Sequence, residues 1–147
     1  MPNLYPTVNL PSLMKPQISD SEKKYRSAPL CDFQTGDFVR DGAGRIVMAD
    51  GKEAFAQWCL KVCVTERGTK LAYSDKIGTE IMSAVKESDA ESVKSSIERT
   101  ITEALMVNPV TEYVKNFSFS IDGDHLFVDF VVKGKNWAEE IALKVGY

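Results

Sequence analysis

The chain is poor in the side chains that most catalytic and metal sites require. Its 147 residues include one histidine and three cysteines. An odd and small number of cysteines cannot build a disulfide framework, so we interpret Cys31, Cys59 and Cys63 as reduced thiols, as in cytosolic proteins. His125 is the only imidazole that a nucleophile–histidine–acid triad could use, and no known catalytic motif accompanies it. We therefore expect no catalytic residue, no metal site and no cofactor.

Long apolar runs and an excess of positive charge are also missing. No run approaches the roughly 18 to 20 apolar residues that span a bilayer, and the start of the chain lacks the basic-then-apolar pattern of a signal peptide. Lysine and arginine total 18 against 21 for aspartate and glutamate, a net charge of −3. Nucleic-acid-binding domains normally have a net basic surface. We expect neither a nucleic acid nor a membrane as a partner.

Proline is concentrated at the start of the chain, where five of the six prolines precede residue 31. Closely spaced prolines interrupt helices and interior strands. The same segment carries more apolar residues than a solvating tail would, namely Leu4, Tyr5, Val8, Leu10, Leu13, Met14 and Ile18. We interpret residues 1–30 as an extended arm and residues 31–147 as the domain. Such an arm either lies on its own domain or is a flexible tail, or it lies along a partner subunit, and the sequence leaves these alternatives open.

The first part of the domain predicts a hairpin followed by a helix. Residues 36–51 read as strand, turn and strand, with glycines placing the turn at 41–44. The next helix begins after Asp50, and Glu53 stands at capping-box spacing from it. Cys59 and Cys63 fall on the apolar stripe of this helix, so we expect both thiols to be buried rather than to bind a metal.

Two more helices and three strands complete the prediction. A short helix is expected over about 77–86, and the strongest helix follows a Ser88–Glu91 capping box and stops at Asn108–Pro109. Residues 125–132 are apolar at nearly every position, which predicts a central strand covered on both faces. The strand before it has apolar residues alternating with polar ones, namely Phe117, Phe119 and Ile121. The last strand is expected to run over 137–147.

The fold class is therefore α+β. We expect a small single domain with two to three helices packed on a C-terminal three-stranded antiparallel meander, plus the extended N-terminal arm. The carboxylates Asp122, Asp124 and Asp129 lie at or near a hairpin end. They lack both the cleft that a glycosidase pair needs and the spacing of a calcium loop, so a turn is the better interpretation.

Two features suit contacts with other chains. Glu66–Arg67 follows the first helix, and arginine makes planar bidentate contacts that fix one subunit against another. The alternative is a solvated charge pair. The last strand leaves an open edge, which is either a joint for another chain's strand or a liability guarded by charges at Glu139, Glu140 and Lys144. The candidate residues for strand addition are Glu139, Ile141, Leu143, Val145 and Tyr147.

Short motifs follow one another along the domain in a characteristic order. They are Phe33, Gly36–Asp37–Phe38, the segment 53–58 (EAFAQW), Val64–Thr65–Glu66–Arg67, Ala72–Tyr73–Ser74, Ile77–Gly78, the helix Ile97 to Leu105, and Val107–Asn108–Pro109. In this order they resemble the phage baseplate wedge family that also serves as the sheath initiator of contractile tails. The branch most similar is that of myophages, defective prophages and bacteriocins of Gram-positive bacteria. The resemblance covers about residues 31–147 and leaves out the arm.

The resemblance implies a structural assembly role. Members join the baseplate wedge and present a small sheet to which the first sheath subunits add strands. The implied partners are the sheath protein and baseplate wedge proteins, with six copies around the tail. Beyond the resemblance, we expect the arm to lie against the wedge or against tube or hub proteins. The implied location is the bacterial cytoplasm during assembly and then the baseplate of a virion or tail-like particle. Glu66 and Arg67 correspond to the ends of the family's Glu-Pro-Arg-type wedge motif, with no proline between them.

Two other functions remain open from the residues alone. A small adaptor could use the same sheet edge for another partner. A cell-wall hydrolase would instead need a pair of catalytic carboxylates, for which the sequence provides no recognisable cleft.

Overall fold

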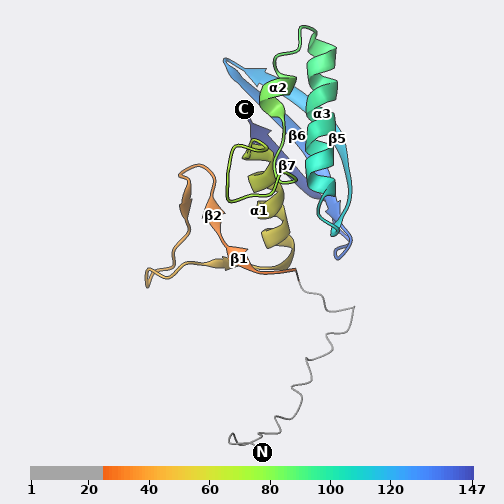
Figure 1. Ribbon diagram of the computed structural model, residues 1–147. Helices are drawn as coiled ribbons and strands as arrows, with labels where there is room; N and C mark the ends of the chain where they lie inside the picture. Colours follow the sequence, from red (N-terminus) through yellow and green to blue (C-terminus); the bar gives the residue numbers. More distant parts are fainter. Residues whose placement is uncertain (1–24) are drawn as a thin grey trace, which may run out of the picture.

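The computed structural model describes residues 25–147, and a three-stranded antiparallel sheet forms one layer of the domain (Figure 1). The strands follow the chain in order across the sheet: β5 (Thr111–Asp122), β6 (His125–Gly134) and β7 (Ile141–Gly146). This meander confirms the predicted α+β fold. Residues 1–24, most of the predicted arm, lie outside the described residues.

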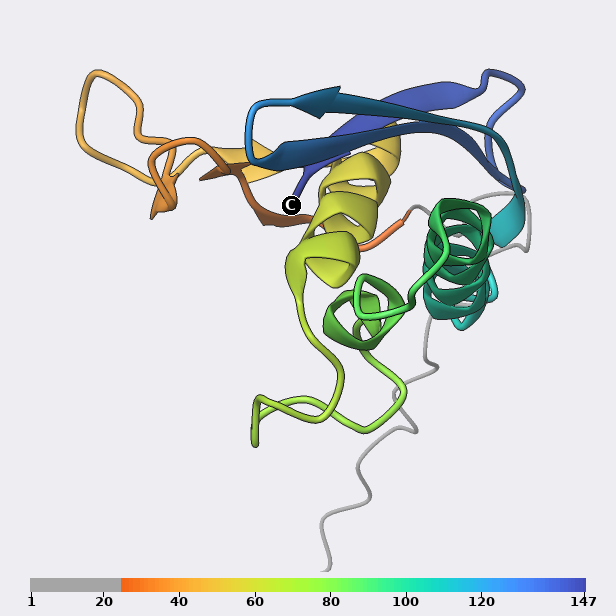
Figure 2. The same ribbon diagram turned by 90° about the horizontal axis from the view of Figure 1, so that it is seen from above.

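All three helices lie on the same face of the sheet (Figure 2). They are α1 (Gly51–Val64), α2 (Ile81–Ala84) and α3 (Ala90–Met106). The prediction that β6 is covered on both faces is therefore wrong. Val128, Phe130 and Val132 are buried beneath the helices, whereas Phe127 and Val131 on the other face are only half-buried. The ammonium group of Lys144 covers the Phe127 ring at 4.9 Å, so a long side chain takes the place of a second layer.

The core fills the space between the sheet and the helices. Its largest fully buried side chains include Phe55, Phe130, Ile97, Ile101 and Leu105. Fully burying such a side chain stabilises the fold by about 1.5–3 kcal/mol. Cys59 and Cys63 are also buried and unpaired, which confirms their place on the apolar stripe of α1.

The helix starts differ from the predicted capping boxes. Asp50 holds the position before α1, but its side chain makes no capping hydrogen bond. Asp89, not Ser88, caps α3, and its carboxylate accepts from the backbone N–H of Ser92 at 3.1 Å. Both residues suit a helix start, so the spacing alone could not separate them. The helix predicted at 77–86 is reduced to α2, a single turn.

The segment 28–49, which we call the N-terminal ribbon, lies beside α1. It holds two short antiparallel pairs, β1 (Ala28–Pro29) with β4 (Met48–Ala49) and β2 (Cys31–Asp32) with β3 (Asp37–Phe38). The predicted turn at 41–44 is present, since Gly44 N–H donates to Asp41 C=O at 2.9 Å. Tyr25 packs edge-on against Phe55 at 5.6 Å between ring centroids. The last residues assigned to the arm therefore contact the domain.

Two strands differ from the prediction at their ends. In β5 the alternation places Ile121 opposite Leu126, but Ile121 lies close to the hairpin end and its residue is 78% exposed. The strand predicted over 137–147 begins only at Ile141. Trp137 instead belongs to the preceding connection, where its ring packs against Phe55 at 5.3 Å. Aromatic packing therefore takes Trp137 out of the sheet.

Candidate functional site

β7 forms one edge of the sheet, and its outer side pairs with no other strand within residues 25–147 (Figure 1). Leu126 and Tyr147 exchange both backbone hydrogen bonds, at 2.8 and 3.0 Å. Hydrogen-bonded and non-hydrogen-bonded pairs alternate along an antiparallel ladder. The peptide groups of the odd-numbered residues of β7 therefore point toward β6. Those of the even-numbered residues point outward, namely Ala142, Lys144 and Gly146.

The apolar side chains of β7 point into the core. Ile141, Leu143 and Val145 are 9%, 9% and 3% exposed. The sequence singled out these three residues for strand addition, but the structure engages both their side chains and their peptide groups within the chain. Strand pairing at this edge would use the peptide groups of the residues between them. The residues predicted for strand addition are thus each one position away from the residues whose backbone groups point outward.

The remaining two candidates hold the ends of β7. The hydroxyl of Tyr147 donates to the carbonyl of Cys63 at the end of α1, at 3.1 Å. Burial raises the pKa of the Tyr147 hydroxyl above its ordinary value. Glu139 precedes β7 and forms an ion pair with Lys52 in the first turn of α1. The hydrogen bond from Lys52 lowers the pKa of the Glu139 carboxyl. The edge strand is therefore tied to α1 at both ends.

A polar cluster ties the start of β7 to β5 across the open face of the sheet. Glu140 accepts from the hydroxyl of Tyr113 and forms an ion pair with Lys115. The hydrogen bond from Lys115 lowers the pKa of the Glu140 carboxyl, and the bond to Glu140 raises the pKa of the Tyr113 hydroxyl. Sequence analysis missed this cluster because it depends on strand register, which no local motif announces.

The guanidinium of Arg67 makes its contacts within the chain. Its Nε and Nη2 donate to the carbonyl of Gly78 at 3.3 and 3.2 Å, and Nη1 pairs with Glu80 at 3.1 Å. The Arg67 side chain is 25% exposed. Its backbone N–H also donates to the carbonyl of Thr79 at 2.8 Å. These contacts close the loop between α1 and α2, so Arg67 fixes the shape of the segment that carries Glu66.

Glu66 is placed differently from its neighbour. Its backbone forms a parallel bridge with Thr79, and its carboxylate makes one long contact of 3.5 Å with the N–H of Met82. The residue lines a cavity of about 480 Å³ between the end of α1, α2 and the C-terminal residue. Val64 and Met82 line the same cavity, and these residues are 54% and 59% exposed. The carboxylate of Glu66 is thus available to another chain, whereas the Arg67 guanidinium is already engaged.

The described residues provide little for catalysis or metal binding. No group of three or more histidine, cysteine, aspartate or glutamate side chains in residues 25–147 could hold a metal ion. Burial raises the pKa of the Cys59 thiol, and it raises that of Cys63 to about 12, so both stay protonated. His125 is exposed at the start of β6. In the part of the chain that the structure describes, no helix is long and apolar enough to cross a bilayer.

Comparison with protein-family models gives a match over most of the chain. The family model described as "Contractile injection system sheath initiator" matches residues 28–136. The matched range contains the N-terminal ribbon, the three helices, β5 and β6, and it ends before β7. No curated protein matches the chain.

Proposed function

Because the chain belongs to the sheath initiator family of contractile injection systems, we propose that it is the baseplate wedge component on which the first sheath ring is built. Family membership itself gives the chain a structural role in such a particle, as a tail or baseplate component in contact with sheath and baseplate proteins. The finer proposal is that a sheath subunit adds a strand to the outer edge of β7. The outer edge of β7, which pairs with no other strand in residues 25–147, is the observation that carries this proposal.

Strand addition at β7 would use backbone groups that are already ordered. Ala142, Lys144 and Gly146 each direct a peptide N–H and C=O outward, and each net hydrogen bond is worth about 0.5–1.5 kcal/mol. The side chains between them are buried, so the strand is held straight before a partner arrives. Such preorganisation lowers the entropic cost of binding. The register of a donated strand would follow from the outward groups rather than from side chains.

The loop between α1 and α2 supplies a second contact in this proposal. Glu66 presents its carboxylate to a wedge protein, and Arg67 contributes by holding the loop through Gly78 and Glu80. Charged hydrogen bonds of an exposed carboxylate confer orientation more than affinity. We further propose six copies around the tail axis, assembly in the bacterial cytoplasm, and contact of the N-terminal arm with the tube or hub. The adaptor alternative would use the same edge of β7 for a partner outside the sheath.

A proline substitution at Lys144 tests the role of the edge. The residue's N–H points outward, so Lys144→Pro removes no hydrogen bond to β6, and its ring stands where a donated strand would pair. Lys144→Thr is the matched control, because it removes the charge and keeps the N–H. Particles from the proline strain should show tubes on baseplates without sheath, and the threonine strain should give sheathed particles in negative-stain images.

This comparison requires that both variants fold and have similar thermal stability. Thermal denaturation followed by circular dichroism checks it on the purified chains. Sheathed particles from a folded Lys144→Pro chain would contradict strand addition at β7. Loss of sheath in both variants would instead assign the effect to the lysine side chain.

A further inference from the structure

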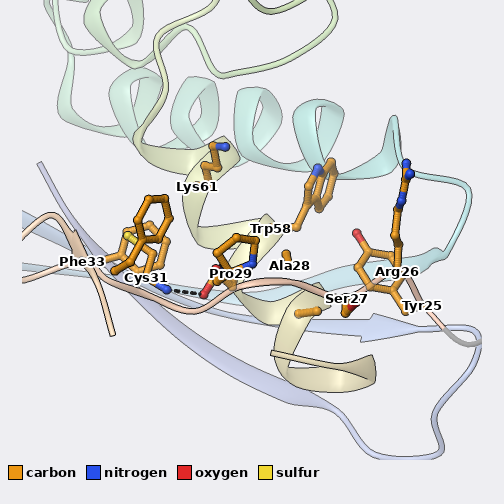
Figure 3. Close-up of a pocket in the computed structure, with 12 residues that line it drawn as sticks. Tyr25, Arg26, Ser27, Ala28, Pro29, Cys31, Phe33, Trp58 and Lys61 are labelled. Carbon is orange, nitrogen blue, oxygen red and sulfur yellow. Dashed lines mark hydrogen bonds between the residues drawn. The ribbon is translucent and has the colours of Figure 1, made fainter. Parts of the chain in front are cut away.

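A groove lies between the N-terminal ribbon and α1 (Figure 3). Its volume is about 580 Å³. Four aromatic side chains line it, namely Tyr25, Phe33, Phe38 and Trp58. Phe33 and Phe38 are 42% and 47% exposed. A groove of this volume with a mainly apolar and aromatic lining has the properties of a binding site.

Gln57 holds the groove's two walls in place. Its amide nitrogen donates to the carbonyl of Pro29 at 2.6 Å, and its amide oxygen accepts from the N–H of Cys31 at 2.8 Å. Pro29, Cys31 and Gln57 all line the groove. The Gln57 side chain thus fastens the ribbon backbone to α1, while Phe33 and Phe38 remain partly exposed. The groove is a formed surface rather than a packing gap.

The lining favours a proline-rich, extended segment. Aromatic grooves bind such segments because a polyproline II helix has little conformational entropy to lose and presents flat apolar rings. The chain itself carries such a segment at residues 2–16, with prolines at 2, 6, 11 and 16. Lys15 is its only charged residue. We propose that the groove binds residues 2–16 of its own chain.

Chain connectivity favours the same molecule over a separate partner. The described chain begins at Tyr25, which is itself part of the groove wall. Residues 17–24 form the link, which can span roughly 26–29 Å when extended. A ligand tethered by a short link has an effective concentration in the millimolar range. The segment therefore has an advantage over free ligands of the same chemistry, and seating it would cover Phe33, Phe38 and Trp58 in the unassembled protein.

Photo-crosslinking in the full chain tests this proposal. Benzoylphenylalanine replaces Val8, and an equal mixture of ¹⁴N- and ¹⁵N-labelled chains is irradiated at low concentration. Mass spectrometry should find crosslinks to peptides 25–38 or 54–61 in which both peptides carry the same isotope. Phe38→Asp should lower this yield about tenfold, because a carboxylate in the groove disfavours an apolar ligand.

Ile121→Asp is the matched control, because Ile121 is exposed outside the groove. It should leave the crosslink yield unchanged. Leu10→Asp tests the same contact from the arm and leaves the folded domain unaltered. Crosslinks that mix the two isotopes would overturn the proposal in favour of the groove of a neighbouring copy. Crosslinks to other parts of the domain, or a yield that Phe38→Asp does not change, would overturn it altogether. These outcomes are independent of strand addition at β7.

Discussion

Replacing Arg67 by alanine separates a docking residue from a structural one. If Arg67 held only a partner, the isolated chain would keep its stability. The structure predicts a loss instead, because the guanidinium donates twice to the carbonyl of Gly78 and pairs with Glu80. Hydrogen bonds from a charged donor contribute about 1.5–3 kcal/mol, and an ion pair to a carboxylate as exposed as that of Glu80 contributes at most about 1 kcal/mol.

We therefore expect Arg67→Ala to lower the free energy of unfolding by about 2–3 kcal/mol. For a chain of this size that corresponds to a fall in Tm of about 10 °C. Urea denaturation followed by circular dichroism measures the change. Glu80→Gln keeps an acceptor and removes the charge, so it should cost less than about 1 kcal/mol. The loss of stability for Arg67→Lys should lie between these two values, because lysine keeps the positive charge and lacks the paired N–H donors of the guanidinium.

An unchanged urea midpoint for Arg67→Ala would refute the assignment of Arg67 to the loop. It would return the residue to the surface that contacts wedge proteins. A loss as large for Glu80→Gln as for Arg67→Ala would place the energy in the ion pair and not in the bonds to Gly78.

Three further predictions follow from individual contacts. Gly78 has a φ of +110°, and a Cβ there would lie 2.7 Å from the carbonyl of Thr65, so Gly78→Ala should lower the unfolding free energy by more than about 2 kcal/mol in urea titrations. Tyr147→Phe removes the hydrogen bond to Cys63 and should cost about 1 kcal/mol, seen as a lower Tm. Burial raises the pKa of Cys63 from 9.0 to about 12 and that of Cys59 in the same direction, so stability should be full below pH 9 and fall as the pH rises from 9 toward 12. Urea midpoints between pH 7 and 11 test this, and a Cys63→Ala chain should show a weaker fall.

Much of the fold was accessible to pattern analysis because its signals are local. The stripe of α1 placed Cys59 and Cys63 in the core, and Asp122–Gly123 marked the β5–β6 hairpin. The number of layers that cover the sheet could not be predicted from such local signals. The apolar run of β6 looked like a strand buried on both faces, because a sequence does not say that Lys144 will lie over the Phe127 ring.

The candidate site shows the same division between local and long-range information. The edge strand was predicted from its position at the end of the meander. Which residues of the strand direct their backbone groups outward could not be predicted, since the outward direction of the Lys144 peptide group follows from the pairing of Leu126 with Tyr147. Likewise Glu66–Arg67 stood out as a pair. Only the folded loop shows that Arg67 is bound to Gly78 while the carboxylate of Glu66 remains accessible.

Amide hydrogen exchange at β7 tests strand addition most directly. In the free chain the N–H groups of Leu143 and Val145 should exchange slowly, because they pair with β6, and those of Ala142, Lys144 and Gly146 should exchange fast. In sheathed particles the three outward amides should become protected by at least about tenfold, while particles from a sheathless strain keep the free-chain pattern. Outward amides that exchange as fast in sheathed particles as in the free chain would contradict strand addition at β7.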